Sequence, residues 1–207
     1  MSFGYKLLYG VGFTPWEDIA DLPAVRERVD GLLAREESGR EPPYGPVLDL
    51  GCGSGIWAVE LARRGWRVTG IDVVPKALRR ARERIREAGV EVRLVEGDVT
   101  KLRTAGVGSG FSFMLDLGLF HDELTDEQRA AMGREVTAVA TPDATLLMVA
   151  WAPGHRGPLP RGASSGDIEA AYAEWEVIDE EAIDLSQLML YKIARKADPR
   201  LYRLRRR

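Results

Sequence analysis

Cysteine and histidine are scarce in this chain, and their scarcity limits its chemistry. Cys52 is the single cysteine, and His121 and His155 are the only histidines among 207 residues. One cysteine cannot form an intrachain disulfide, and these few residues do not make a metal-ligand cluster. We therefore predict a cytoplasmic protein without a metal site.

Long apolar runs and net positive charge are also missing. No stretch approaches the ~20 apolar residues of a membrane span, and the N-terminus lacks the pattern of a secretory signal. The net charge of −3 argues against the broad basic surface that nucleic acids need. Five arginines within residues 200–207 are the exception. We interpret them as a solvated end; the alternative is a basic clamp on an acidic substrate, an anionic membrane or RNA.

The length and the 45% hydrophobic content predict a single domain with a sizeable core, which we place at residues 47–207. Residues 1–46 precede it, with a helical stretch from about Pro23 to Ala34. Such a segment can fold over a ligand as a lid that excludes water. A helix that merely covers one sheet face is an equally good interpretation. The aromatic residues expected to line a lid or acceptor site are Tyr9, Phe13, Trp16 and Trp151.

The most informative stretch is residues 47–55, which read VLDLGCGSG. The apolar start is typical of a parallel strand buried on both faces, and the alternating glycines let the backbone approach a ligand. In an open α/β sheet, ligands bind outside the carboxyl end of such a strand. A dinucleotide fold needs Gly-x-Gly-x-x-Gly, whose third glycine would fall at Ile56.

A second carboxylate follows at the end of the next expected strand. Ile56–Arg64 has helical apolar spacing with Gly65 as its C-cap, and Trp66–Asp72 is predicted to be a strand. A carboxylate at that strand end can accept hydrogen bonds from both hydroxyls of a ribose. We therefore assign Asp72 to a ribose, with a plain turn or helix cap as the alternative. Val73 would offer apolar surface to the base.

Further helices and strands alternate along the chain. Helices are predicted at Pro75–Ala88 and after the capping-box pattern of Thr125 to Gln128. Only residues 100–110 separate the third strand from the fourth, so the helix there must be short or absent. This order predicts a doubly wound, mostly parallel α/β sheet. The remaining expected elements are strands at Val90–Val95, Phe111–Asp116 and Ala144–Trp151, a loop at Pro153–Gly166, a helix at Asp167–Trp175, a strand at Glu176–Ile183, a helix or strand at Ser186–Lys196 and a final antiparallel strand from Leu201.

The turn after the first strand resembles the first motif of the class I S-adenosylmethionine (SAM) methyltransferases, Asp/Glu-x-Gly-x-Gly-x-Gly, at every position. This resemblance implies a seven-stranded Rossmann-like sheet with an antiparallel C-terminal hairpin, and SAM as cofactor. It also places Asp98 beside the adenine amino group, although Gly-Asp at a strand end is a common turn. The expected cofactor-binding residues are Asp49, Gly51, Cys52, Gly53, Gly55, Asp72, Val73, Asp98, Val99, Asp116 and Leu117.

A narrower resemblance, to the thiopurine, thiol and tellurite-resistance methyltransferases, rests on three short patterns. These are a Pro-Trp element at Trp16, Asp-x-Gly-x-Phe-His from Asp116 to His121, and a Tyr-x-Leu-Arg-Arg ending. The loop after the fifth strand lacks the substrate residues of that group, so the acceptor stays open. The Asn/Asp-Pro-Pro-Tyr/Phe motif of enzymes that methylate amides or base amines is also missing, which argues against DNA-adenine and protein-glutamine substrates.

These patterns favour SAM-dependent transfer of a methyl group to a small, partly apolar O, S or N nucleophile. Positioning can supply roughly 7–11 kcal/mol, whereas a general base contributes only ~10²–10⁴-fold, so orientation should dominate. His121 is the best candidate base, and Asp116 could orient it or the substrate; a helix-capping or surface His121 is the alternative. A non-catalytic SAM-binding module and, with less support, an NAD(P)-dependent reductase are the competing functions. Nothing in the sequence indicates an oligomeric state.

Overall fold

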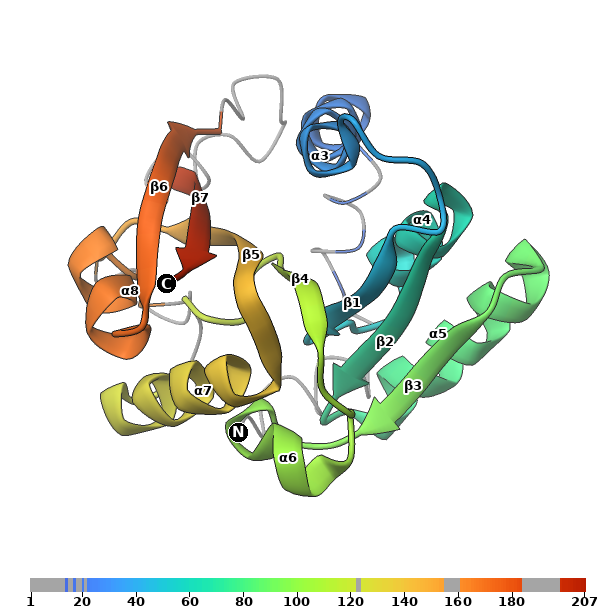
Figure 1. Cartoon of the computed structure of the whole chain (residues 1–207). Helices are drawn as coiled ribbons and strands as arrows, with labels where there is room; N and C mark the ends of the chain where they lie inside the picture. Colours follow the sequence, from blue (N-terminus) through green and yellow to red (C-terminus); the bar gives the residue numbers. More distant parts are fainter. Residues whose placement is uncertain are drawn as a thin grey trace.

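The computed structural model describes residues 14, 17, 20, 22–121, 124–154, 161–183 and 198–207. Its strands are β1 (Gly45–Leu50), β2 (Trp66–Asp72), β3 (Val92–Glu96), β4 (Phe111–Asp116), β5 (Ala140–Trp151), β6 (Trp175–Ala182) and β7 (Pro199–Arg206). They form one seven-stranded sheet in the order β3-β2-β1-β4-β5-β7-β6 (Figure 1). β1 to β5 pair in parallel, and β7 is antiparallel to β5 and β6. The predicted doubly wound sheet with an antiparallel C-terminal hairpin is confirmed.

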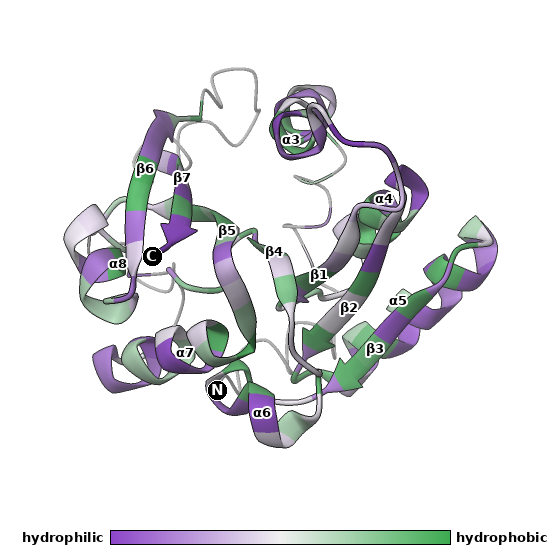
Figure 2. Ribbon diagram, in the orientation of Figure 1, coloured by the Kyte–Doolittle hydropathy of each residue, from purple (hydrophilic) through white to green (hydrophobic). Residues whose placement is uncertain are grey.

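Helices cover both faces of the sheet. They are α3 (Pro23–Glu37), α4 (Ile56–Arg64), α5 (Pro75–Ala88), α6 (Leu102–Ala105), α7 (Asp126–Val139) and α8 (Ser165–Ala171), with a 3₁₀ turn at Val99–Lys101. Val47 packs with α3 and α4, whereas its neighbour Leu48 packs with α7 and α8. This alternation follows from the twofold side-chain period of a strand. The outward sides of α5 and α7 are largely hydrophilic (Figure 2). None of the described helices has the length and apolar content needed to cross a bilayer.

Several boundaries differ from those predicted. β3 begins at Val92 rather than Val90, and β5 begins at Ala140 rather than Ala144. The helix expected at Asp167–Trp175 spans Ser165–Ala171, because Ser164 and Asp167 form a capping box one turn earlier. Trp175 instead opens β6, where its indole nitrogen donates to Thr137 Oγ1 at 2.8 Å. The short helix between β3 and β4 is confirmed as α6, and residues 186–196 lie outside the described ranges.

The arginine-rich C-terminus is strand β7, in which Arg205 is exposed and Arg200, Arg203 and Arg206 are half-buried. Arg200 pairs with Glu180 at 2.7 Å, and Arg205 with Asp143 at 3.4 Å. Arg203 binds Glu36 of α3, and Arg206 donates to a backbone carbonyl of β5. These partners within the chain reduce the positive charge that this strand can offer to an outside anion.

Helix α3 lies on the sheet and is tied to the C-terminal hairpin by charge. Val29, Leu32 and Leu33 of α3 are buried against the strands, and Arg35 reaches Asp179 and Glu181 of β6 at 3.0 and 2.8 Å. For this part of the N-terminal segment, covering a sheet face is therefore the observed role. The aromatic lid residues Tyr9, Phe13 and Trp16 lie outside the described residues, so the lid stays a prediction.

Candidate functional site

Three carboxylates meet at the carboxyl edge of the parallel strands. Asp49 lies near the end of β1, and Asp72 and Asp116 end the neighbouring strands β2 and β4. Burial, together with the negative charges of Asp72 and Asp116, raises the pKa of Asp49 to about 7. Burial also raises the pKa of Asp72, and that of Asp116 to about 6. The edge therefore gathers three carboxyl groups that are largely shielded from water, and a cationic or hydrogen-bond-donating ligand would favour their ionised forms.

The glycine-rich turn is held in place by Asp72. Gly51, Gly53 and Gly55 all have positive φ, at 68°, 51° and 77°, a conformation that residues with a Cβ rarely adopt. Asp72 Oδ2 accepts from the Gly53 amide at 2.9 Å, and Oδ1 accepts from the Val74 amide at 2.8 Å. The predicted ribose acid therefore also fixes the loop that would lie beside the ligand.

Asp49 is a buried carboxyl group near the end of β1. It is 4% exposed, and its Oδ2 atom is buried with no hydrogen-bond partner among the described residues. A buried polar atom without a partner is costly, and an ionised one more so. This orphaned oxygen fits an ammonium group of the kind that the methionine part of SAM carries.

Cys52 plays a packing role in the loop. It is 8% exposed, and a Cβ added to Gly70 of β2 would lie 2.9 Å from its sulfur. Burial raises the pKa of the Cys52 thiol well above its usual range. The thiol is therefore protonated at neutral pH.

Asp116 shapes the turn after β4. It is fully buried, and its Oδ1 atom accepts from the amides of Gly118, Leu119 and Phe120 at 3.1, 2.7 and 3.4 Å. Its Oδ2 atom has no hydrogen-bond partner among the described residues. These bonds place Leu119 over the glycine loop, where a Cβ on Gly51 would lie 3.3 Å from the Leu119 side chain. The hydrogen bonds of Asp116 thus go to backbone amides rather than to His121. Leu117, the next residue, packs on the face of the sheet opposite to that of Leu119.

His121 is buried beside Trp151. It is 5% exposed, its ring stacks on Trp151 with centroids 5.3 Å apart and planes 13° apart, and Nδ1 lies 3.3 Å from the Val149 carbonyl oxygen. The N-cap of α7 is Thr125, as the capping-box pattern predicts. The alternative of a helix-capping or surface His121 is therefore wrong. The stack joins the turn that follows β4 to the end of β5.

Asp98 and Val99 follow β3 at the same edge. Asp98 Oδ1 accepts from the amide and hydroxyl of Thr100 at 2.8 and 2.7 Å, which caps the 3₁₀ turn. Val99 is 2% exposed and packs in the core. Asp98 thus has a local structural role, and its contact with adenine stays a prediction.

Two contributors to this site are missing from the predicted set. Leu119 covers Gly51, and Arg84 of α5 binds Ser54 in the glycine loop at 2.7 Å. Neither carries a sequence signal of its own, because each depends on a long-range approach that the spacing within a single element does not reveal. Ser54 itself is 3% exposed and lies inside the motif.

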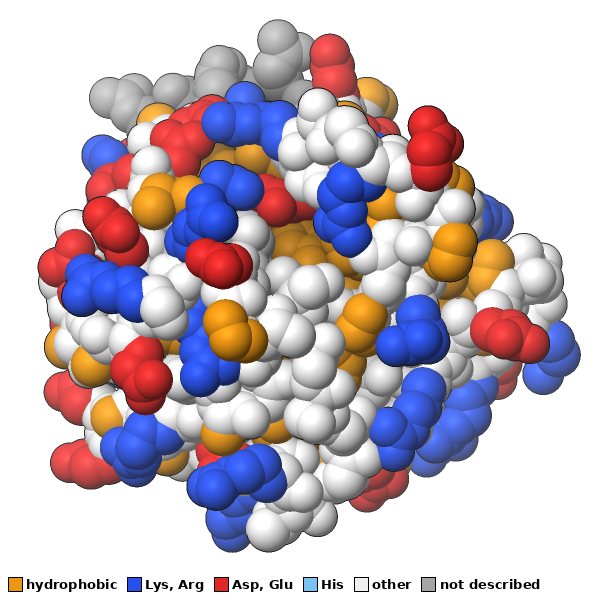
Figure 3. Space-filling view, in the orientation of Figure 1, with side chains coloured by type: hydrophobic (Ala, Val, Ile, Leu, Met, Phe, Trp, Pro, Cys, Tyr) orange, Lys and Arg blue, Asp and Glu red, His pale blue; other side chains and the backbone are white. Residues whose placement is uncertain are grey.

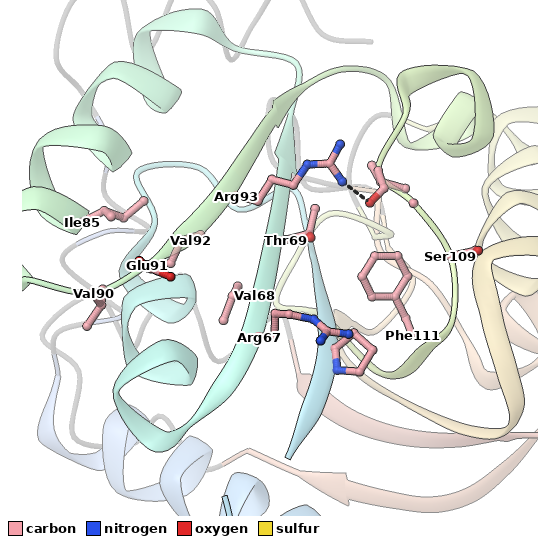
Figure 4. Close-up of a pocket in the computed structure, with 13 residues that line it drawn as sticks. Arg67, Val68, Thr69, Ile85, Val90, Glu91, Val92, Arg93, Ser109 and Phe111 are labelled. Atoms are coloured by element: carbon pink, nitrogen blue, oxygen red, sulfur yellow. Dashed lines mark hydrogen bonds between the residues drawn. The ribbon is translucent and has the colours of Figure 1, made fainter. Parts of the chain in front are cut away.

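A separate hollow of about 620 Å³ opens at the amino-terminal ends of β1 to β4, away from the acidic edge (Figure 4). Arg67, Thr69 and Phe111 line part of it. Arg93, which also lines it, donates to the carbonyl oxygens of Val107 and Gly106 at 2.7 and 2.6 Å. None of the predicted site residues lies here, so we place the functional site at the carboxyl edge.

The distribution of surface charge and of metal-ligating side chains also bears on which ligand the site takes. Basic and acidic side chains are mixed over much of the visible face, which does not present one broad basic surface (Figure 3). Across the ranges that the structure describes, no group of three histidine, cysteine or acidic side chains could hold a metal ion. The carboxyl edge of the parallel strands suits a small ligand that binds through backbone and carboxylate contacts.

The sheet order, the glycine loop after β1 and the acidic end of β2 together define a class I methyltransferase fold. Residues 47–143 match the family model described as "Methyltransferase domain". Domains of this family use SAM as the methyl donor. The match agrees with the glycine spacing and argues against an NAD(P)-dependent reductase.

Among curated relatives, the chain is similar to a 2-heptyl-1-hydroxyquinolin-4(1H)-one methyltransferase of Mycobacteroides abscessus. The two are 28% identical over 154 residues, which is 72% of this chain and 64% of the relative. It is also similar to a ubiquinone biosynthesis O-methyltransferase of Methylobacterium sp., with 48% identity over 72 residues, 34% of this chain and 29% of the relative. The chain spans 21% to 64% of the length of the curated relatives that it matches.

A solved structure has the same fold over nearly the whole chain. The magnesium protoporphyrin IX methyltransferase of Synechocystis PCC 6803, crystallised with bound SAM, has a TM-score of 0.72 at 19% identity, covering 97% of this chain and 93% of that one. At this identity the similarity concerns the fold alone. The narrower resemblance to thiopurine and related methyltransferases stays a prediction.

Proposed function

We propose that the chain transfers the methyl group of SAM to a small, partly apolar O, S or N nucleophile. The observation that carries this proposal is the glycine loop held by Asp72 beside the orphaned carboxylate oxygen of Asp49. In this proposal Asp72 accepts from the ribose hydroxyls, Asp49 faces the ammonium group, Val73 offers apolar surface to the adenine, and Asp98 accepts from its amino group.

SAM, when bound, supplies a methyl group already activated by its sulfonium, so the protein mainly has to position the nucleophile. The turn of Asp116 would hold Leu119 against the donor side of the site, and the stacked His121 and Trp151 would form a wall toward the acceptor. The buried setting would exclude water, which competes as a nucleophile. His121 would take up the proton of the methyl acceptor when that molecule is not already ionised.

Calorimetry with SAM, its demethylated product and NADH tests the cofactor, and transfer of a labelled methyl group to a panel of small molecules tests catalysis. The panel should contain thiols, phenols, fatty acids and hydroxyquinolinones, the last because a relative is named for such an acceptor. SAM binding with label transfer supports the proposal. Binding without transfer to any acceptor would favour a non-catalytic SAM-binding module instead.

The affinity for SAM should fall as the pH is lowered from 7.5 to 5.5. Because the pKa of Asp49 is about 7, the ligand-free chain holds this carboxyl mostly protonated below that pH, whereas an ammonium group favours the carboxylate. We expect the Kd to rise by up to about tenfold per pH unit below pH 7. Calorimetric titrations across this range measure the slope, and the Asp49→Asn variant should lose most of it.

Stability of the ligand-free chain should change with pH in the opposite direction. The folded pKa of Asp49 is raised above its unfolded value of 3.8, so the folded state binds more protons than the unfolded state between these two values. Its contribution is therefore present at low pH and lost as the pH rises through about 7. Urea unfolding at several pH values measures this. A D49N variant whose two pH profiles both match the wild type would contradict the assignment of Asp49.

Replacing His121 by alanine should lower turnover about 10²-fold or more, the contribution expected of a general base, without changing the affinity for SAM. The His121→Asn variant retains polarity but cannot take up a proton, so it should be similarly slow. Turnover of both variants, measured with SAM and acceptor at saturation, tests the role. Full activity in H121N would remove His121 from the mechanism.

A further inference from the structure

Helix α5 approaches the glycine loop closely. A Cβ added to Gly55 would lie 3.0 Å from the Cβ of Ala81, so that position and the helix are in direct contact. Three residues further along α5, Arg84 is on the same side of the helix. From there its Nη1 atom donates to both the carbonyl oxygen and the hydroxyl of Ser54, each at 2.7 Å. Ser54 is 3% exposed, so these bonds end inside the protein.

The loop is thus held from two sides. Asp72 binds the Gly53 amide on one side, and Arg84 binds Ser54, the next residue, on the other. α5 begins three residues after Asp72, so one short segment provides both supports. We propose that Arg84 is a positioning residue for the SAM site, which holds the second half of the glycine loop in its binding conformation. This inference rests on the proposed function, since it assigns Arg84 a role at the same loop.

Because Arg84 is a charged donor with two short hydrogen bonds, its loss should weaken SAM binding more than the loss of an exposed surface arginine. Hydrogen bonds to charged groups are stronger than those between neutral groups. Without Arg84 the loop must be ordered when SAM binds, so the loss should appear in binding rather than in the chemical step. We expect Arg84→Met to raise the Kd and the KM for SAM by about tenfold, with kcat at saturating SAM close to that of the wild type.

The closing experiment compares four variants with the wild type by calorimetry with SAM and by steady-state kinetics. Arg82→Met is the matched control, because Arg82 is exposed on the same helix and its replacement removes the same charge. Ser54→Ala removes one of the two acceptors and should give a smaller loss than R84M. In the double variant S54A/R84M the two losses should not add, because both act through one contact.

The outcomes separate the possible explanations. A tenfold rise in Kd for R84M but not for R82M, with non-additivity in the double variant, supports the inference. If the Met variant does not fold, Arg84→Lys, which keeps the charge and a donor, should still show an intermediate rise in Kd. Equal Kd values for R84K or R84M and R82M would overturn the role of Arg84. A wild-type chain that does not bind SAM would instead contradict the proposed function itself.

Discussion

Replacing Asp72 by alanine should reduce the affinity for SAM at least about a hundredfold, because two effects combine. The variant loses the acceptor for two ribose hydroxyls, and hydrogen bonds to charged groups contribute ≈ 1.5–3 kcal/mol each. It also loses the bonds to the Gly53 and Val74 amides, at 2.9 and 2.8 Å, that hold the glycine loop and the start of α5. Calorimetric titration with SAM and with its demethylated product measures the loss.

Two further variants separate these effects. Asp72→Asn keeps an oxygen that can accept from the Gly53 amide but removes the charge, so its affinity should fall less than that of the alanine variant. Glu96→Gln is the matched control for negative charge, because Glu96 is exposed and pairs in register with Asp72 at the end of β3. Its affinity should stay within about twofold of the wild type. If D72A bound SAM as well as E96Q does, the ribose assignment would be wrong.

Elements with local boundary signals are predicted from the sequence to the residue. The bounds of α4 and α5 match, since Gly65 and Gly89 end these helices in the left-handed conformation at φ 102° and 65°. Pro75 begins α5, where its fixed φ suits the first helical turn. β2 matches because it lies between a glycine cap and a polar turn. In each case a single residue at the boundary is sufficient to set where the element begins or ends.

Elements whose limits depend on distant partners are predicted less well. β5 extends back to Ala140 because that residue pairs with Phe111 of β4, a contact that local spacing does not reveal. The start of α8 differs for a local reason, because Asp167 completes its capping box in place of the more usual Glu or Gln. The three site carboxylates are predictable, since strand ends in a parallel sheet converge. The packing of His121 is not, because its partner Trp151 lies at the end of β5, thirty positions away along the chain.

Gly133 has the tightest packing of the described glycines, and its replacement by alanine should strongly destabilise the fold. A Cβ there would lie 1.9 Å from the carbonyl oxygen of Ala171, where α7 passes the end of α8. Because the obstacle is backbone, the helices must move apart, and we expect a loss of about 3 kcal/mol or more in the free energy of unfolding. Urea denaturation of the ligand-free chain measures it.

The same substitution at Gly31 should have the opposite sign. Gly31 lies within α3, with no atom within 4 Å of a Cβ added there, so alanine should stabilise by about 0.5–1 kcal/mol through helix propensity and a less flexible unfolded state. G133A should also lower activity, because Arg129 of α7 donates to the carbonyl oxygens of Phe120 and Gly162 at 3.1 and 2.7 Å, beside His121. If G133A and G31A unfolded at the same urea concentration, the close approach of α7 and α8 would be wrong, and with it the path by which α7 positions the turn after β4.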